Sequence, residues 1–60
     1  MFAVRIDSKK RSRPKTERGK VWVKSASHQY YVDIKERGLF ETKEDAEIAK
    51  TEPWEIIVNV

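Results

Sequence analysis

The stretch at residues 8–19 has the composition of a surface that binds anions. It reads SKKRSRPKTERG, with six Lys or Arg, a single acid and no hydrophobic side chain. Such a stretch has nothing to bury in a core, so we expect a loop that is mobile in the free protein. Clustered cations neutralise phosphates or bind acidic protein surfaces, and the loop predicts a partner of one of these kinds. The candidate contacts in this basic loop are Lys9, Lys10, Arg11, Arg13, Lys15 and Arg18.

Other kinds of chemistry find little support in the sequence. His28 is the only histidine, no cysteine is present, and the neighbouring Ser25 and Ser27 fall in a predicted turn. A metal site needs several ligands, and a nucleophile needs a base and a group that orients it. We therefore expect no enzyme activity, no metal and no cofactor. We also expect a cytoplasmic protein without a membrane partner, because no apolar run nears the roughly 20 residues of a membrane span and no secretory leader is recognisable.

The elements that must position the basic loop follow from the alternation of residue types. Apolar residues alternate in the first residues of the chain, and β-branched and aromatic residues crowd three later segments, which predicts strands. Thr42 and Asp45 have the spacing of a helix-capping box, and Pro53 ends the helix that follows. The predicted elements are a strand at 1–7, strands at 20–24 and 29–35 around a turn at 25–28, a turn at 36–38, a helix at 43–50 and a strand at 54–60.

This order predicts one α+β domain over residues 1–60. A small antiparallel sheet, with elements in the order β-β-β-α-β, would carry one short helix packed on one of its faces. The two alanines at positions 46 and 49 would let the helix lie close to the sheet.

The predicted hairpin sorts its side chains between two faces. With the turn at 25–28, Trp22 lies opposite Tyr31, and both point away from the core. The core face would hold Phe2, Val4, Ile6, Val21, Val23, Tyr30, Val32, Ile34, Ile56 and Val58. The outward face would hold Arg5, Lys20, Trp22, Lys24, Tyr31, Asp33, Lys35 and Ile57. Aromatic and basic residues on one sheet face suit nucleic acid, although a Trp–Tyr pair can also simply stabilise a hairpin.

Charge is divided unevenly along the chain. Residues 1–24 hold nine Lys or Arg and two acids, for a net charge of +7, whereas residues 25–60 hold four Lys or Arg and eight acids, for a net charge of −4. The total of +3 therefore conceals a basic half and an acidic half, and only the basic half should attract phosphates.

Residues 20–49 resemble the arm-binding modules at the N-terminus of phage-type tyrosine recombinases. The residues that carry the resemblance are Trp22, Gly38, Phe40, Thr42, Asp45 and Ala46. In that family a three-stranded sheet is laid against the major groove of DNA. The resemblance implies that Lys20, Trp22, Lys24, Tyr31 and Lys35 form such a sheet face, and that DNA rather than RNA is the nucleic acid.

The β-β-α-β order also resembles small phage proteins that bind and inhibit host RNA polymerase. The leading hypothesis is a small nucleic-acid-binding protein of phage or mobile-element origin, which binds through the basic loop together with Lys20, Trp22, Lys24 and Tyr31. The alternative is a phage-type modulator of a host protein, which binds an acidic surface or pairs through an exposed edge strand without catalysis. The sequence leaves the oligomeric state open.

Overall fold

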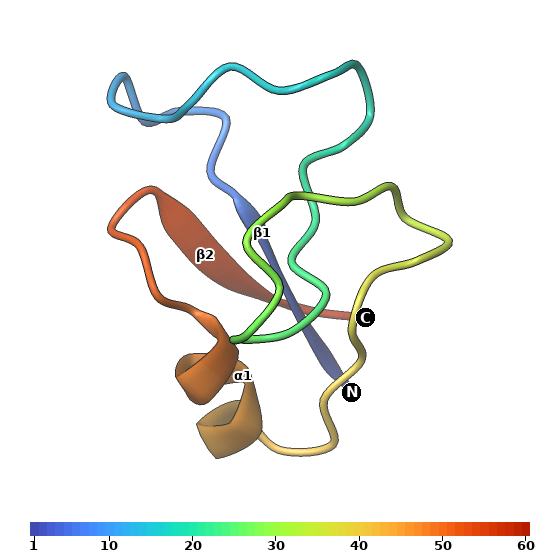
Figure 1. Cartoon of the computed structure of the whole chain (residues 1–60). Helices are drawn as coiled ribbons and strands as arrows, with labels where there is room; N and C mark the ends of the chain where they lie inside the picture. The colour runs from blue at the N-terminus through green and yellow to red at the C-terminus, as the bar shows by residue number, and fades with distance from the viewer.

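A computed structural model, which describes all 60 residues, contains two strands and one helix (Figure 1). Strand β1 spans Phe2–Ile6, helix α1 spans Lys43–Ala49 and strand β2 spans Glu55–Asn59. The fold class is therefore α+β, with a two-stranded antiparallel sheet and one short helix. The basic loop and α1 lie at opposite ends of the molecule (Figure 1). No helix has the length and apolar character that crossing a membrane requires.

Strand β1 is the central element of the fold. It pairs with β2 in an antiparallel register that sets Phe2 opposite Asn59 and Ile6 opposite Glu55. Its other edge is also occupied, because the Ile6 amide donates to the Val21 carbonyl at 2.9 Å and the Val23 amide donates to the Val4 carbonyl at 2.9 Å. The predicted first strand is confirmed in type, and Val4 and Ile6 are buried as expected.

The predicted strands at 20–24 and 29–35 are present only as isolated bridges. Trp22 bridges Arg5 of β1 on one side and Val32 on the other. The predicted register, with Trp22 opposite Tyr31, is therefore wrong by one residue. A turn explains the short pairing, because the Asp33 carboxylate accepts the amides of Lys35 at 3.0 Å and Glu36 at 3.2 Å. A short acidic side chain that bonds the following backbone in this way favours a turn over an extended strand.

The register change alters which side chains of the third predicted strand are buried, although Val32 is buried as predicted. Tyr31, expected to point outward, packs against the core, whereas Tyr30 and Ile34, expected in the core, are exposed. The turn expected at 36–38 also comes earlier, around Asp33. Gly38 follows it, and its amide donates to the Val23 carbonyl at 3.0 Å. A Cβ at this position would overlap the Lys24 carbonyl oxygen, so only glycine fits.

The core lies between the sheet and α1. Its buried centre consists of Val4, Val23, Ala46 and Ala49, and four larger side chains pack around it, namely Phe2, Tyr31, Phe40 and Ile57. The helix alanines approach the sheet closely, as their size predicts. The helix begins after Thr42, whose hydroxyl accepts the Asp45 amide at 3.1 Å, and it ends one residue before the predicted boundary. The predicted Thr42 cap is thus confirmed, whereas the Asp45 carboxylate makes no return bond to the Thr42 amide.

Strand β2 presents the opposite face from the one predicted. Ile57 packs against the core cluster, and Ile56 and Val58 lie on the other face of the sheet. The reason is Glu55, which is only 3% exposed. Its carboxylate accepts the Tyr31 hydroxyl at 2.5 Å and the Thr51 amide at 3.0 Å, so a charged side chain occupies an inward position that apolar patterning assigns to its neighbours.

Candidate functional site

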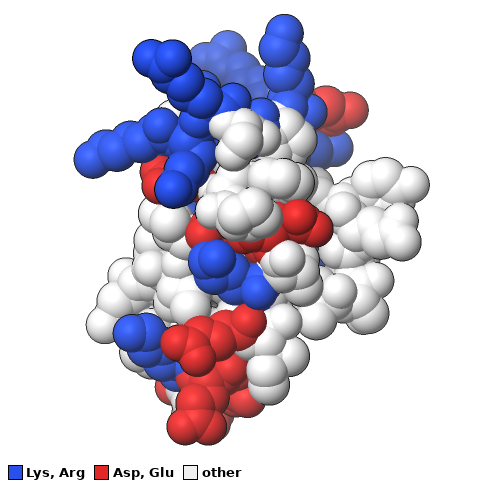
Figure 2. Space-filling view, turned by 90° about the vertical axis from the view of Figure 1, so that its left-hand side faces the viewer, with Lys and Arg blue, Asp and Glu red and all other residues white.

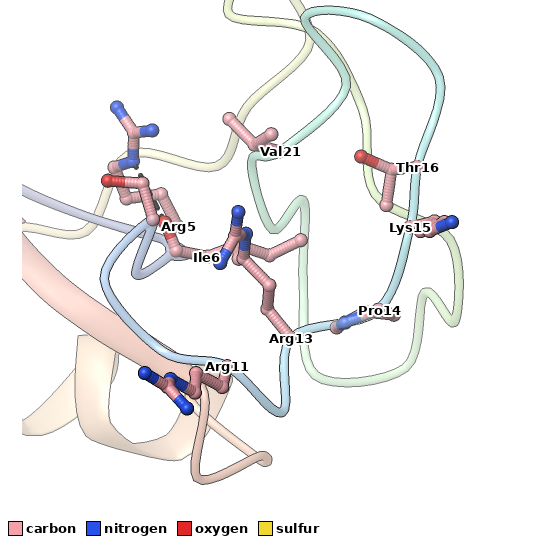
Figure 3. A pocket seen from close by; sticks show the side chains of 9 residues that line it. Arg5, Ile6, Arg11, Arg13, Pro14, Lys15, Thr16 and Val21 are labelled. Atoms are coloured by element: carbon pink, nitrogen blue, oxygen red, sulfur yellow. Dashed lines mark hydrogen bonds between the residues drawn. The ribbon is translucent and has the colours of Figure 1, made fainter.

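A basic cleft of about 480 Å³ lies between the basic loop and the end of β1 (Figure 3). Ile6 and Val21 are its two apolar lining residues, and most of the others belong to the basic loop. Figure 3 shows the Arg13 side chain extending from the loop toward Ile6. The cleft contains no acidic side chain, and its cations are Arg5, Arg11, Arg13 and Lys15. Four cations without a counter-charge make this cleft suitable for an anion such as phosphate.

Local hydrogen bonds fold the basic loop around the cleft. Asp7 ends β1 and turns the chain, because its carboxylate accepts the Lys9 amide at 3.0 Å and its carbonyl accepts the Lys10 amide at 3.1 Å. The Arg13 guanidinium donates to the Lys10 carbonyl at 2.7 Å, which draws the loop inward. At the far end, Gly19 has a φ of +81°, a backbone conformation that favours glycine. The loop is therefore a defined excursion with turns at both ends.

Trp22 holds two arginine side chains beside the cleft. The Arg5 guanidinium carbon lies 5.2 Å from the centre of the indole ring, and that of Arg37 lies 4.5 Å away. The Arg5 side chain also donates to the Ile6 carbonyl at 3.2 Å. A guanidinium over an aromatic face gains about 0.5–2 kcal/mol, depending on its hydration. Trp22 is thus half-buried and stacked with cations, and it fixes Arg5 at the cleft wall.

The predicted contact residues divide into three groups by position. Arg11, Arg13 and Lys15 line the basic cleft. Lys20 lines a neighbouring hollow, and its ammonium lies 2.9 Å from the Glu17 carboxylate. This ion pair lowers the pKa of Glu17 and raises the pKa of Lys20. The remaining loop and strand cations are exposed and line neither hollow, namely Lys9, Lys10, Arg18 and Lys24.

Tyr31 belongs to a hydrogen-bonded network rather than to an open aromatic face. Its hydroxyl donates to the Glu55 carboxylate at 2.5 Å and accepts the Trp54 indole N–H at 2.7 Å. Burial, together with the bond to Glu55, raises the pKa of Tyr31 to about 12. The aromatic pair predicted for Trp22 and Tyr31 is therefore absent, and Tyr31 packs against the core instead.

The charge of the folded molecule is as segregated as the charge of the sequence. Lys and Arg side chains crowd the end formed by the basic loop, and Asp and Glu side chains gather at the opposite end, near α1 (Figure 2). The molecule is 28 Å long, well over the Debye length of about 10 Å at 0.1 M ionic strength. The acidic end therefore does not cancel the field of the basic end.

Two side chains at this end were not among the predicted contacts. Arg5 was expected only on the outward face of the sheet. The sequence does not show that β1 pairs with residues 21–23, and this pairing is what sets Arg5 next to Trp22. Tyr30 was assigned to the core by the incorrect register, and it is 76% exposed.

No three His, Cys, Asp or Glu side chains lie close enough together to hold a metal ion.

The chain matches no protein-family model, no curated protein and no solved structure.

Proposed function

We propose that this chain is a small nucleic-acid-binding protein that acts in the cytoplasm and grips phosphates in the basic cleft. One observation carries the proposal: Arg5, Arg11, Arg13 and Lys15 all line one cleft that has no acid among its lining residues. Arginine forks pair with two phosphate oxygens at once, and lysine adds charge without demanding a fixed geometry.

The exposed cations outside the cleft have a different role in this proposal. Lys9, Lys10, Arg18 and Lys24 would attract the polyanion and follow its backbone without a fixed position. Trp22, covered by Arg5 and Arg37, would position a cleft cation rather than stack on a base. Tyr31 would support the fold. Lys20 would contribute when its Glu17 partner gives way to phosphate.

DNA is the proposed nucleic acid, and a phage or mobile element the proposed source. Both parts rest on the resemblance of residues 20–49 to the arm-binding modules of phage-type recombinases. The sheet-face mode of that family would need residues 20–24 and 29–35 to pair more extensively than the isolated bridges allow. We therefore assign the main contact to the cleft and the basic loop.

A salt titration of binding to labelled single-stranded and duplex oligonucleotides tests the proposal. If four phosphates are neutralised, log Kd rises with log salt with a slope of about 3 for single strands and about 4 for duplex. Affinity then falls about 100-fold between roughly 50 and 200 mM salt. Absence of measurable binding at low salt would contradict the proposal, and so would binding that does not respond to salt.

The open edge of β2 supports a second candidate, a modulator that inhibits a host protein such as RNA polymerase. In β1, the backbone groups of Phe2, Val4 and Ile6 point away from β2. The hydrogen bonds between the two strands are therefore made by Ala3 and Arg5 of β1. The amides of Ile57 and Asn59 therefore face outward, and no other backbone group accepts them. A strand of another protein could add at this edge.

Nuclease treatment separates the two candidates. A modulator would retain one host protein in equimolar amount after nuclease treatment of a lysate. Asn59→Pro removes one outward amide and should abolish that retention if β2 is the binding edge. Retention that survives this substitution would contradict binding at the β2 edge, and complete loss after nuclease would favour nucleic acid.

A further inference from the structure

Tyr30 is an exposed aromatic side chain without a structural role in the fold. It is 76% exposed, more than any other large hydrophobic side chain of the protein. Its one aromatic neighbour is His28, which meets it edge-on with ring centres 6.3 Å apart and an angle of 77° between the planes. No hydrogen bond holds its hydroxyl in place. The ring is therefore available to a ligand.

The ring lies beside the basic loop. A hollow of about 430 Å³ has Tyr30 and Gln29 among its lining residues, together with Lys15, Thr16 and Lys20 from or next to the loop. Its volume falls within the range of small-molecule sites, about 300–1,000 Å³. The only acid that lines it is Glu17, whose carboxylate is paired with Lys20. Two tyrosines, Tyr30 and Tyr31, and two cations thus line one recess, and of the two rings only Tyr30 is largely exposed.

This Tyr30 hollow and the basic cleft share a wall. Pro14, Lys15 and Thr16 line both, so a chain that crosses this short segment passes from the cleft to the tyrosine. Phosphates in the cleft and an aromatic base on Tyr30 could then belong to neighbouring nucleotides of one strand. Lys15 is available to the phosphate between them.

We infer that this protein prefers single-stranded nucleic acid, with an unpaired base stacked on Tyr30 and the adjoining backbone held in the basic cleft. This inference rests on the proposed function and narrows its substrate class. Bases within a duplex already stack on both sides and cannot offer a face to a side chain, whereas bases of a single strand can. Stacking is tolerant of base identity because every base has a flat π-face, so little sequence preference is expected.

Substitution of Tyr30 tests the inference. Tyr30→Ala should weaken binding to a labelled oligothymidylate by about 5- to 150-fold, the range expected from the loss of one stacked base. Duplex affinity should change less than about two-fold, and the salt slope should stay the same, because no phosphate contact is lost. Tyr30→Phe keeps the ring and should bind as the wild type does. Ile48→Ala, at another exposed apolar side chain on α1, is the matched control.

Ring signals of Tyr30 in an NMR titration give an independent readout that does not depend on a variant. Its ring protons should shift upfield with the single strand and stay in place with the duplex. Equal losses for both nucleic acids in Tyr30→Ala, or ring signals that do not move, would overturn the inference while leaving the proposed function intact. Failure of the wild-type protein to bind either nucleic acid would instead overturn the proposed function.

Discussion

Single side chains decide which cations of this protein are available. Trp22 holds Arg5 and Arg37 against its ring, so these two guanidinium groups are positioned before any ligand arrives. Glu17 does the reverse for Lys20, since it occupies the ammonium with an ion pair of 2.9 Å. A pre-positioned cation loses less conformational entropy on binding than a free one, and a paired cation must first give up its partner.

Removal of the Glu17 carboxylate should therefore strengthen binding. Glu17→Gln frees Lys20 and should tighten nucleic-acid affinity about two- to five-fold at low salt, the worth of a typical exposed ion pair. The measurement is the Kd of a labelled oligonucleotide. Glu44→Gln on α1 makes the same change in net charge at the acidic end, and it should have a smaller effect. Equal gains in the two variants would show that only total charge matters.

The Tyr31 hydroxyl should set the alkaline limit of stability. Its pKa is raised in the folded protein from about 10 to about 12, so folding favours the neutral phenol. The stabilisation is complete below about pH 10 and is lost as the pH rises toward about 12. Tyr31→Phe should lower stability at neutral pH, because Glu55 and Trp54 each lose a hydrogen bond, and should flatten the decline at high pH.

Urea unfolding at pH 8 to 12, followed by far-UV circular dichroism, measures this profile. Tyr30→Phe removes a hydroxyl that makes no hydrogen bond and should keep the wild-type decline. A decline of the same steepness in Tyr31→Phe would refute the role of this hydroxyl.

At the level of elements, the basic loop is an excursion between β1 and residues 21–23. Turns at Asp7 and Gly19 close it, and Pro14 near its middle lines both the basic cleft and the Tyr30 hollow. The loop therefore has two kinds of cation, which line the cleft or extend into solvent. Variants with the same net charge can distinguish the contributions of these two kinds of cation.

Two triple variants make this separation. One variant removes three cleft cations by the substitutions Arg11→Gln, Arg13→Gln and Lys15→Gln. The other removes three cations outside the cleft by the substitutions Lys9→Gln, Lys10→Gln and Arg18→Gln. Each set lowers the net charge from +3 to zero. The cleft set should reduce the salt slope by about 2 to 3 units, because each lost phosphate contact removes about 0.7–0.9. The outer set should reduce it by less than about one unit.

Equal slopes in the two sets would mean that the loop acts as a diffuse charge and that the cleft has no special role. Both sets alter exposed side chains of a segment outside the core, so the thermal unfolding midpoint should stay close to that of the wild type.

The sequence predicted the local elements better than their pairing. The strand β1, the Thr42 cap and the loop at 8–19 each follow from local residue patterns, and all three were predicted. The hairpin register was not, because the connection between the paired residues Trp22 and Val32 is one residue longer than the turn at 25–28 predicts. The inward face of β2 was missed because Glu55 is stabilised by Tyr31, which lies 24 residues away in sequence.

The same limit applies to the candidate site. The loop cations were recognisable from composition alone, and three of them line the cleft. Arg5 and Tyr30 could not be recognised, because their positions depend on which residues pair across the sheet. Composition therefore predicted the charge of the site, and only the tertiary structure showed its shape and its aromatic component.

For the whole molecule, the hydrophobic core is small and most residues, including the entire basic loop, lie outside it. Only eight residues are buried, and the basic loop contributes none of them. The free energy of unfolding should therefore be small, as is common for a domain of this length. Phosphate bound in the cleft would stabilise the folded state by mass action, so ligand and stability are expected to be linked.

If the protein binds nucleic acid as proposed, the separation of charge between its two ends should also limit how many copies accumulate on a strand. A molecule that lays its basic end on a strand turns the acidic α1 end outward (Figure 2). The outside of the coated strand is then negative again, and another strand would be repelled from it. Association should stop at a single layer, which keeps coated strands apart and in solution.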